Sequence, residues 1–167
     1  AAARGVTREH VLEQEALHVP AGCDGLMSVL DWLAPTDKPF RKGIMLGFDA
    51  RHTRAHGYRS ILEAIALTMK DKVDAMTGEL GTELSEVVIS GGGSSSALFM
   101  QIFADVFGIP ASRAHGPGGA SLGAAICAAV ATGVYPDFAT AVARMEKPRE
   151  AFAPDPGNTD VYRRLNA

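Results

Sequence analysis

The segment that decides the fold reads EVVISGGGSSSALFMQIFADVFGIP, residues 86–110. It opens at 86–90 with a run of β-branched residues that has the length of a strand, and glycines then interrupt it. Beyond the turn, Leu98, Ile102 and Val106 recur at the spacing of one helical face. The order strand, glycine turn, helix predicts an α/β protein.

The triple glycine, Gly91 to Gly93, suits a ligand that lies close to the backbone. Glycine admits backbone conformations closed to other residues and places no side chain between backbone and ligand. The following helix offers unpaired N–H groups and a positive dipole end, and Ser94 to Ser96 can cap it or donate to a ribose or phosphate. These properties suit a nucleotide. A glycine cluster taken alone favours a simpler interpretation, a structural turn with a serine N-cap.

The turn matches neither of the common nucleotide-binding loops. A Walker loop needs GxxxxGK[ST], and no lysine follows Gly93. The dinucleotide fingerprint needs GxGxxG, and Ser96 stands where its last glycine should be. No acidic residue follows at a strand end about 20 positions on, which disfavours a fragment of a Rossmann-type oxidoreductase.

Periodicity and helix breakers predict the remaining elements. The longest is a helix over 54–76, capped by Thr53 or Asp49, with an apolar stripe that we expect to be buried against the strand at 86–90. The stripe comprises Ile61, Ile65, Met69 and Val73. A helix of small residues over 120–131 is expected to pack closely on the sheet. The others are helices over 7–17, capped by Thr7, and 138–145, strands within 22–33 and over 111–115, an extended piece at 43–49, and an extended tail from 148 with a last turn near 162–165.

The composition excludes several classes of function. The 167 residues suffice for one domain, and 47% hydrophobic with 21% charged residues is ordinary for a soluble globular protein. A net charge of -3, spread along the chain, argues against nucleic-acid binding. Cys23 and Cys127 lack the spacing of a disulfide framework or a zinc site. Without an apolar run of ~20 residues or a signal peptide, we expect a cytoplasmic protein with no membrane partner.

Three stretches carry a residue pattern specific to one family. They are residues 89–96 with Gln101, Ala104-Asp105 and Gly108-Ile109-Pro110; residues 43–47 with His52 to His56 and Arg59 to Ala64; and Ser121 to Ala125 with Ala128 and Gly133. In that order they resemble the adenosine-binding segment, the C-terminal signature and the helix that closes the nucleotide site in FGGY carbohydrate kinases, members of the actin, hexokinase and Hsp70 superfamily. The agreement extends over nearly the whole chain. Phe48, Gly57 and the lack of a Gly-Glu-Arg-x-Pro loop in 34–40 depart from the pattern.

The resemblance implies an α/β fold that is helix-rich around a short sheet: the C-terminal lobe of the actin/hexokinase/Hsp70-like, ribonuclease H-like fold. Residues 1–167 would then be the C-terminal nucleotide-binding domain of an ATP-dependent kinase acting on a sugar or polyol, with the N-terminal sugar-binding domain absent. The chain also begins without a strand to open an α/β domain, which suggests a cut edge. The tail and the residues around Trp32 look closer to the ribulokinase and pentulose-kinase branch.

The same resemblance assigns a nucleotide site. Gly91, Gly92 and Gly93 would receive the base and ribose of ATP, Ser96 would contact the adenine or ribose edge, and Ser94 is a further candidate. The catalytic residues and most Mg²⁺ contacts are expected from the absent domain, so the chain alone would be inactive. The chain could form a homodimer. An alternative function is a stand-alone, non-catalytic module that binds nucleotides or regulates another protein.

Several polar residues suggest chemistry but have simpler structural interpretations. His52 and His56 would share a helix face, yet no carboxylate completes a metal site, and His56 is expected to brace the long helix. Asp49 is expected to cap that helix and Asp105 to bond nearby backbone, rather than act as a general base. Glu63 is a hypothetical contact at the domain interface. Both cysteines are expected to be buried as small apolar residues.

Overall fold

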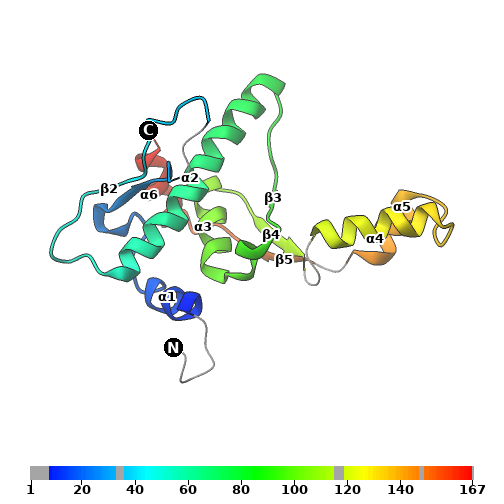
Figure 1. Ribbon diagram of the computed structural model, residues 1–167, viewed down its shortest axis with the longest axis horizontal. Helices are drawn as coiled ribbons and strands as arrows, with labels where there is room; N and C mark the ends of the chain where they lie inside the picture. Colours follow the sequence, from blue (N-terminus) through cyan, green and yellow to red (C-terminus); the bar gives the residue numbers. More distant parts are fainter. Residues whose placement is uncertain (1–7, 33–35, 115–118, 147–148, 167) are drawn as a thin grey trace.

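Figure 1 shows the computed structural model of the chain, which describes residues 8–32, 36–114, 119–146 and 149–166. Helices predominate over two small sheets, which confirms the expected helix-rich α/β class. In chain order the elements are α1 (Arg8–Ala16), the 3-10 turn η2 (Cys23–Gly25), β1 (Met27–Val29), β2 (Ile44–Leu46), α2 (Arg54–Leu80), β3 (Val87–Val88), the 3-10 turn η3 (Gly92–Ser95), α3 (Ala97–Phe107), β4 (Ala111–Ala114), α4 (Gly119–Ala131), α5 (Phe138–Met145), β5 (Arg149–Phe152) and α6 (Pro156–Leu165).

Most elements lie where the sequence predicts them, and apart from the tail the differences fall at their ends. β3 is shorter than the predicted strand at 86–90, and α2 continues through Gly78 to Leu80. The tail forms a strand and a full helix, α6, instead of an extended piece with one last turn. The predicted cap of α1, Thr7, lies outside the described residues.

The three-stranded sheet has the order β3-β4-β5. β3 and β4 are parallel, with Val87 opposite Ala111. β5 runs antiparallel to β4 and places Glu150 opposite Arg113. β1 and β2 form a separate antiparallel ribbon. Because β3 and β4 point the same way, the segments that follow them leave the sheet at the same edge.

α3 forms the centre of the hydrophobic core and packs against α2, α6 and β4. Its side chains Met100 and Ile102 are fully buried. At its N-terminus the Ser96 hydroxyl accepts a hydrogen bond from the amide of Phe99, 3.1 Å away. At its C-terminus Gly108 adopts a left-handed conformation with φ 68°. The sequence therefore places this helix correctly, including both of its ends.

α2 begins at a reciprocal cap. The Thr53 hydroxyl accepts from the amide of Ala55 at 3.3 Å, and the amide of Thr53 donates to Nδ1 of His56 at 3.2 Å. Thr53 rather than Asp49 is thus the cap, and the structural role expected of His56 is confirmed. The helix ends at Gly81, which has φ 63°.

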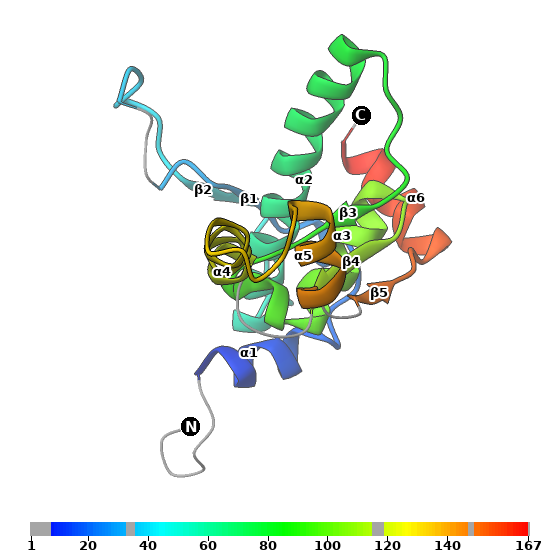
Figure 2. The same ribbon diagram turned by 90° about the vertical axis from the view of Figure 1, so that its right-hand side faces the viewer.

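The buried face of α2 differs from the predicted apolar stripe. Met69 is 48% exposed, and Ile61, Ile65 and Val73 are only partly buried. The helix packs against α1, α3 and β1, and its buried residues are Ala55, Arg59, Ser60, Glu63, Ala64 and Ala66. The prediction that the stripe is buried against the strand at 86–90 is therefore wrong, although Ile65 packs against the main core. The C-terminal end of α2 projects beyond the rest of the molecule (Figures 1 and 2).

A buried ion pair ties α2 to two distant segments. Arg59 Nε donates to Glu63 Oε1 at 2.7 Å, and the same oxygen accepts from the Tyr162 hydroxyl of α6 at 2.8 Å and from the Gly22 amide at 3.2 Å. Burial, reinforced by the Glu63 carboxylate, raises the pKa of the Tyr162 hydroxyl, so it stays protonated and donates. Glu63 acts as a structural acceptor inside the chain, and its role at a domain interface stays a prediction.

The segment that Glu63 holds is a left-handed turn. The φ angles of Gly22, Cys23, Asp24 and Gly25 are 81°, 50°, 52° and 92°. This region is costly for the two residues that are not glycine. The bond from Gly22 to Glu63 and a contact of 3.2 Å between the Asp24 carboxylate and His56 Nε2 help to stabilise it. Cys23 is fully buried, as expected, and this burial raises the pKa of its thiol.

α4 and α5 pack on each other and extend beyond the sheet (Figure 1). Among their described residues only Ile126 and Ala141 are buried, and Cys127 is exposed. The expectations that α4 packs closely on the sheet and that Cys127 is buried are therefore wrong. Small side chains predict close packing but do not identify the partner, which here is α5.

No helix in the described parts of the chain combines the length and apolar character that crossing a membrane requires.

The burial of α3 and the exposure of the α2 stripe can be tested with two truncations. Ile102→Ala should lower the free energy of unfolding by about 2–5 kcal/mol, because it removes contacts in a fully buried position. Met69→Ala should change it by no more than about 0.5 kcal/mol, because that side chain is half exposed. Urea denaturation followed by circular dichroism measures both. Equal midpoints for the two variants would contradict the packing described for α2 and α3.

Candidate functional site

The turn that follows β3 and the helix that follows β4 meet at one edge of the sheet. Residues 91–96 leave the carboxyl end of β3, and α4 begins at Gly119, after β4. A Cβ atom placed on Gly119 would lie 3.5 Å from the Cβ of Ser90, the residue just before the turn. Ligands of open α/β sheets bind in the crevice outside the carboxyl ends of the strands. This edge is therefore the candidate site.

The glycines leave the backbone of the turn open. Gly91 has φ 94° and ψ −172°, a conformation that residues with side chains rarely adopt. Next to Gly91 and Gly92, no described atom beyond their chain neighbours lies within 4 Å of the place a Cβ would take. A Cβ on Gly93 would come within 2.8 Å of the Phe99 ring. Gly91 and Gly92 therefore leave space for a ligand, whereas Gly93 makes room for Phe99.

The serine hydroxyls are used within the protein. Ser94 Oγ donates to the carbonyl of Gly91 at 2.8 Å, and Ser95 Oγ donates to that of Gly92 at 2.6 Å. Ser96 Oγ donates to Glu13 Oε1 of α1 at 2.7 Å while it caps α3. The structural interpretation of Ser96 as an N-cap is thus confirmed. Ligand contacts by Ser94 and Ser96 stay predictions.

Two residues that sequence reasoning missed hold the turn from outside. Glu13 holds its exit through Ser96. Arg113 of β4 donates from Nη1 to the carbonyl of Ser94 at 2.6 Å. A signal for Arg113 was present in the sequence, because a lone charged residue within a predicted strand beside a glycine turn needs a partner. Nothing in the pattern of α1 distinguishes Glu13 from the other carboxylates of that helix.

The other polar candidates have structural roles. His52 Nδ1 accepts from the amide of Asp49 at 2.9 Å, and the described residues include no group of three His, Cys, Asp or Glu arranged to hold a metal. The side chain and backbone of Arg51 lower the pKa of Asp49 to about 2. Asp105 accepts from the amide of Asp155, and also from Asn158 Nδ2 at 2.9 Å, so it fixes the start of α6 as expected of a backbone-bonding residue.

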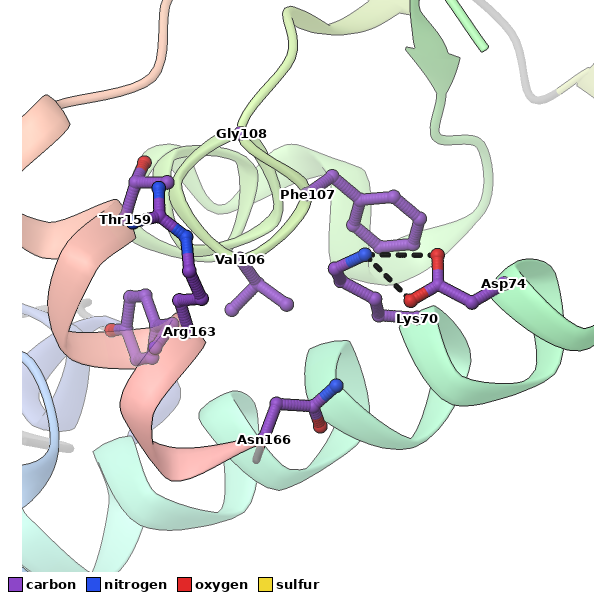
Figure 3. A pocket seen from close by; sticks show the side chains of 9 residues that line it. Lys70, Asp74, Val106, Phe107, Gly108, Thr159, Arg163 and Asn166 are labelled. Atoms are coloured by element: carbon purple, nitrogen blue, oxygen red, sulfur yellow. Dashed lines mark hydrogen bonds and ion pairs between the residues drawn. The ribbon is translucent and has the colours of Figure 1, made fainter. Parts of the chain in front are cut away.

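A cavity of about 530 Å³ lies between α2, the C-terminal end of α3 and α6 (Figure 3), and no residue of the glycine turn lines it. Its charged groups already have partners. Lys70 bonds both carboxylate oxygens of Asp74, at 2.8 and 2.7 Å, and lies 5.7 Å from the centroid of the Phe107 ring. Arg163 bonds Asp160 at 2.8 Å. The cavity is large, but its charged side chains form ion pairs within the protein, with no charged group left among the described residues that line it to select a ligand. It is therefore the weaker candidate site.

Comparison with known proteins decides the family. Residues 6–132 match the C-terminal domain of the FGGY family of carbohydrate kinases. The chain belongs to this family. Among curated relatives, the FGGY chain is 49% identical over 99% of its length to the uncharacterised sugar kinase YgcE of Escherichia coli, covering 34% of that protein. It is 37% identical over its whole length to a ribulokinase of Mycolicibacterium smegmatis, covering 30% of it. The chain spans about a third of the length of these relatives.

Solved structures agree with this assignment. The FGGY chain matches the xylulose kinase of Rhodospirillum rubrum with a TM-score of 0.80 and 34% identity, over 99% of this chain and 33% of that one. It matches the Plasmodium falciparum glycerol kinase with ADP with a TM-score of 0.76 and 19% identity, over 95% of this chain and 32% of that one, which shows a shared fold. The expected fold, the C-terminal lobe of an actin/hexokinase-like protein, is confirmed.

The capping role of Ser96 yields a prediction about stability. Ser96→Ala should lower the free energy of unfolding by about 1 kcal/mol or more, because it removes the cap of α3 and the bond to Glu13. Ser95→Ala should have a smaller effect, because its exposed hydroxyl bonds only the turn itself. Ser96→Thr should restore most of the loss, because threonine also caps helices. Thermal and urea unfolding measure all three, and a silent Ser96→Ala would exclude the capping role.

Proposed function

We propose that residues 1–167 form the adenosine-binding, C-terminal domain of an ATP-dependent carbohydrate kinase that phosphorylates a sugar or polyol hydroxyl. One observation supports the glycine turn as the nucleotide site of this chain. An open glycine turn leaves the carboxyl end of β3 beside the first residue of α4, at the edge where α/β sheets bind ligands. The similarly folded glycerol kinase of Plasmodium falciparum was solved with ADP, which supports an adenine nucleotide as the ligand.

The turn can receive a flat group on its backbone. The adenine and ribose would lie against Gly91 and Gly92, where a Cβ would meet open space. The backbone there is held by the hydroxyls of Ser94 and Ser95, so little ordering remains to be done when a ligand binds. A polar contact from Ser94 would require its hydroxyl to leave the Gly91 carbonyl, and one from Ser96 would use the remaining capacity of a capping group.

Phosphoryl transfer is mainly positioning and electrostatic stabilisation by metal and cationic groups. The carboxylate of Glu13 accepts a hydrogen bond from Ser96, and that of Glu150 accepts one from Arg113. Because both carboxylates are already bonded, this edge of the sheet does not fit a Mg²⁺ site, and we assign it no step that involves the ion. We propose that the base and the Mg²⁺ contacts come from the part of the whole kinase that corresponds to the unmatched two thirds of the relatives. The names of the relatives include ribulokinase, xylulose kinase and glycerol kinase, which support a sugar or polyol as the class of substrate.

The nucleotide site can be tested by filling the space beside the turn. Gly92→Val should reduce adenosine and ATP binding below detection, because the new side chain occupies the open face, where its Cβ would have no described protein atom within 4 Å beyond its chain neighbours. Gly78→Val is the matched control, since that glycine is also open but lies on α2. Saturation-transfer NMR detects weak binding by the 167-residue chain, and its melting temperature reports folding. Equal binding by wild type and Gly92→Val would remove the turn from the site.

This division of labour also predicts an inactive chain. The 167 residues alone should transfer no phosphoryl group from ATP to pentuloses, hexuloses or polyols, because positioning of both reactants needs two lobes that close on them. An ATP-coupled assay over a panel of these substrates measures it. Sustained turnover by the purified chain would contradict the proposal that catalytic groups lie outside it.

A further inference from the structure

We propose that Arg113 is a positioning residue that holds the glycine turn in the conformation that receives the nucleotide. The inference rests on the proposed function of the turn. Arg113 lies on β4, at the middle of the sheet, and the turn lies 19 residues earlier in the chain. Its side chain joins the two at the carbonyl of Ser94, next to the glycines.

The bond from Arg113 is of a strong kind. The distance between Nη1 and the Ser94 carbonyl oxygen is 2.6 Å, and the donor carries a charge that is only 18% exposed to solvent. Charge-assisted hydrogen bonds are shorter and stronger than neutral ones. The bonds that Ser94 and Ser95 make stay within the turn itself, so they fix its shape but not its place on the sheet. Arg113 supplies a connection between the middle of the turn and the sheet.

Arg113 is itself held in place. Its Nε and Nη2 donate to Glu150 Oε2 at 2.9 and 2.8 Å, and Glu150 lies directly opposite on β5. The guanidinium carbon lies 5.2 Å from the centroid of the Phe152 ring, also on β5. A planar guanidinium bonds a carboxylate and a carbonyl in a fixed geometry while it stacks on an aromatic ring, and a lysine ammonium lacks this rigid, planar set of donors. The antiparallel pairing of β5 with β4 thus orients the group that positions the turn.

The effect of Arg113 on affinity depends on how often the turn occupies its binding conformation. If the turn leaves its receiving conformation part of the time, the measured dissociation constant rises by the inverse of the fraction that remains competent. A positioning residue acts on the adenosine cradle and so weakens adenosine, ADP and ATP by the same factor. A residue that touched the phosphates would weaken ATP most and leave adenosine unchanged.

The experiment compares Arg113→Met with Arg51→Met in the 167-residue chain. Both variants lose one positive charge and one ion pair. Arg51 pairs with the exposed Asp49 in the segment before α2, which is separate in sequence from the glycine turn. Hydrogen exchange of the amides at 91–96 reports the turn directly, and NMR titration gives the affinities for adenosine, ADP and ATP. Arg113→Met should speed exchange in the turn and weaken all three ligands by a common factor of roughly tenfold or more, the scale of one hydrogen bond to a charged group. Arg51→Met should do neither.

Two further variants keep the test decisive. Arg113→Lys should recover part of the affinity, since the ammonium keeps the charge and can still donate to the Ser94 carbonyl. Glu150→Gln should give a smaller loss than Arg113→Met, because the guanidinium remains but is less firmly oriented. If Arg113→Met unfolds, Glu150→Gln decides the question. A loss that grows from adenosine to ATP, or unchanged exchange at 91–96, would overturn the proposal. If the wild-type chain binds none of the three ligands, the proposed function fails, whereas the exchange measurement still decides whether Arg113 holds the turn.

Discussion

One oxygen atom, Glu63 Oε1, joins the parts of the chain on which the rest of the structure depends. It accepts hydrogen bonds from Arg59 on the same helix, from Tyr162 near the C-terminus and from the amide of Gly22 near the N-terminus. Removing one member of such a buried pair typically costs about 3–5 kcal/mol, because an uncompensated charge is left in the interior. The long helix α2 is thus positioned by this polar contact as well as by its packing on α1, α3 and β1.

This anchoring has a consequence for the candidate site. α2 and α6 both pack against α3, and the N-terminus of α3 receives the end of the glycine turn. The contacts of Glu63 therefore help to position α3, whose cap Ser96 marks the boundary between turn and helix. The turn is held at one end by this helix and by Glu13 of α1, and in its middle by Arg113 of β4. The turn, which is not paired with any described strand, is thus held by three separate parts of the fold: α1, α3 and β4.

The candidate site is an open edge of the sheet and not a deep cavity, a shape that agrees with the proposed function. In a kinase that closes two lobes around its reactants, each lobe carries part of the site on its surface. The turn offers open backbone at Gly91 and Gly92, while the hydroxyls of Ser94 and Ser95 are bonded within the turn, which would suit the proposed half of such a site. The cavity beside Lys70 lies elsewhere, and its ionic groups compensate one another.

The sequence by itself determined the class of fold, the order of its elements and the position of the glycine turn. These are local properties: β-branched runs, helical spacing, glycine and a capping serine act within a few residues, and the resemblance to FGGY kinases depends on the same segments. Only the tertiary structure decided which face of α2 is buried, where α4 packs and what holds the turn. Periodicity shows that Ile61, Ile65 and Met69 share a face but does not name its partner, and the buried face proved to contain Arg59 and Glu63 instead. The bonds of Glu13 and Arg113 to the turn join positions far apart in the chain, and such contacts exist only once the helices and strands have packed.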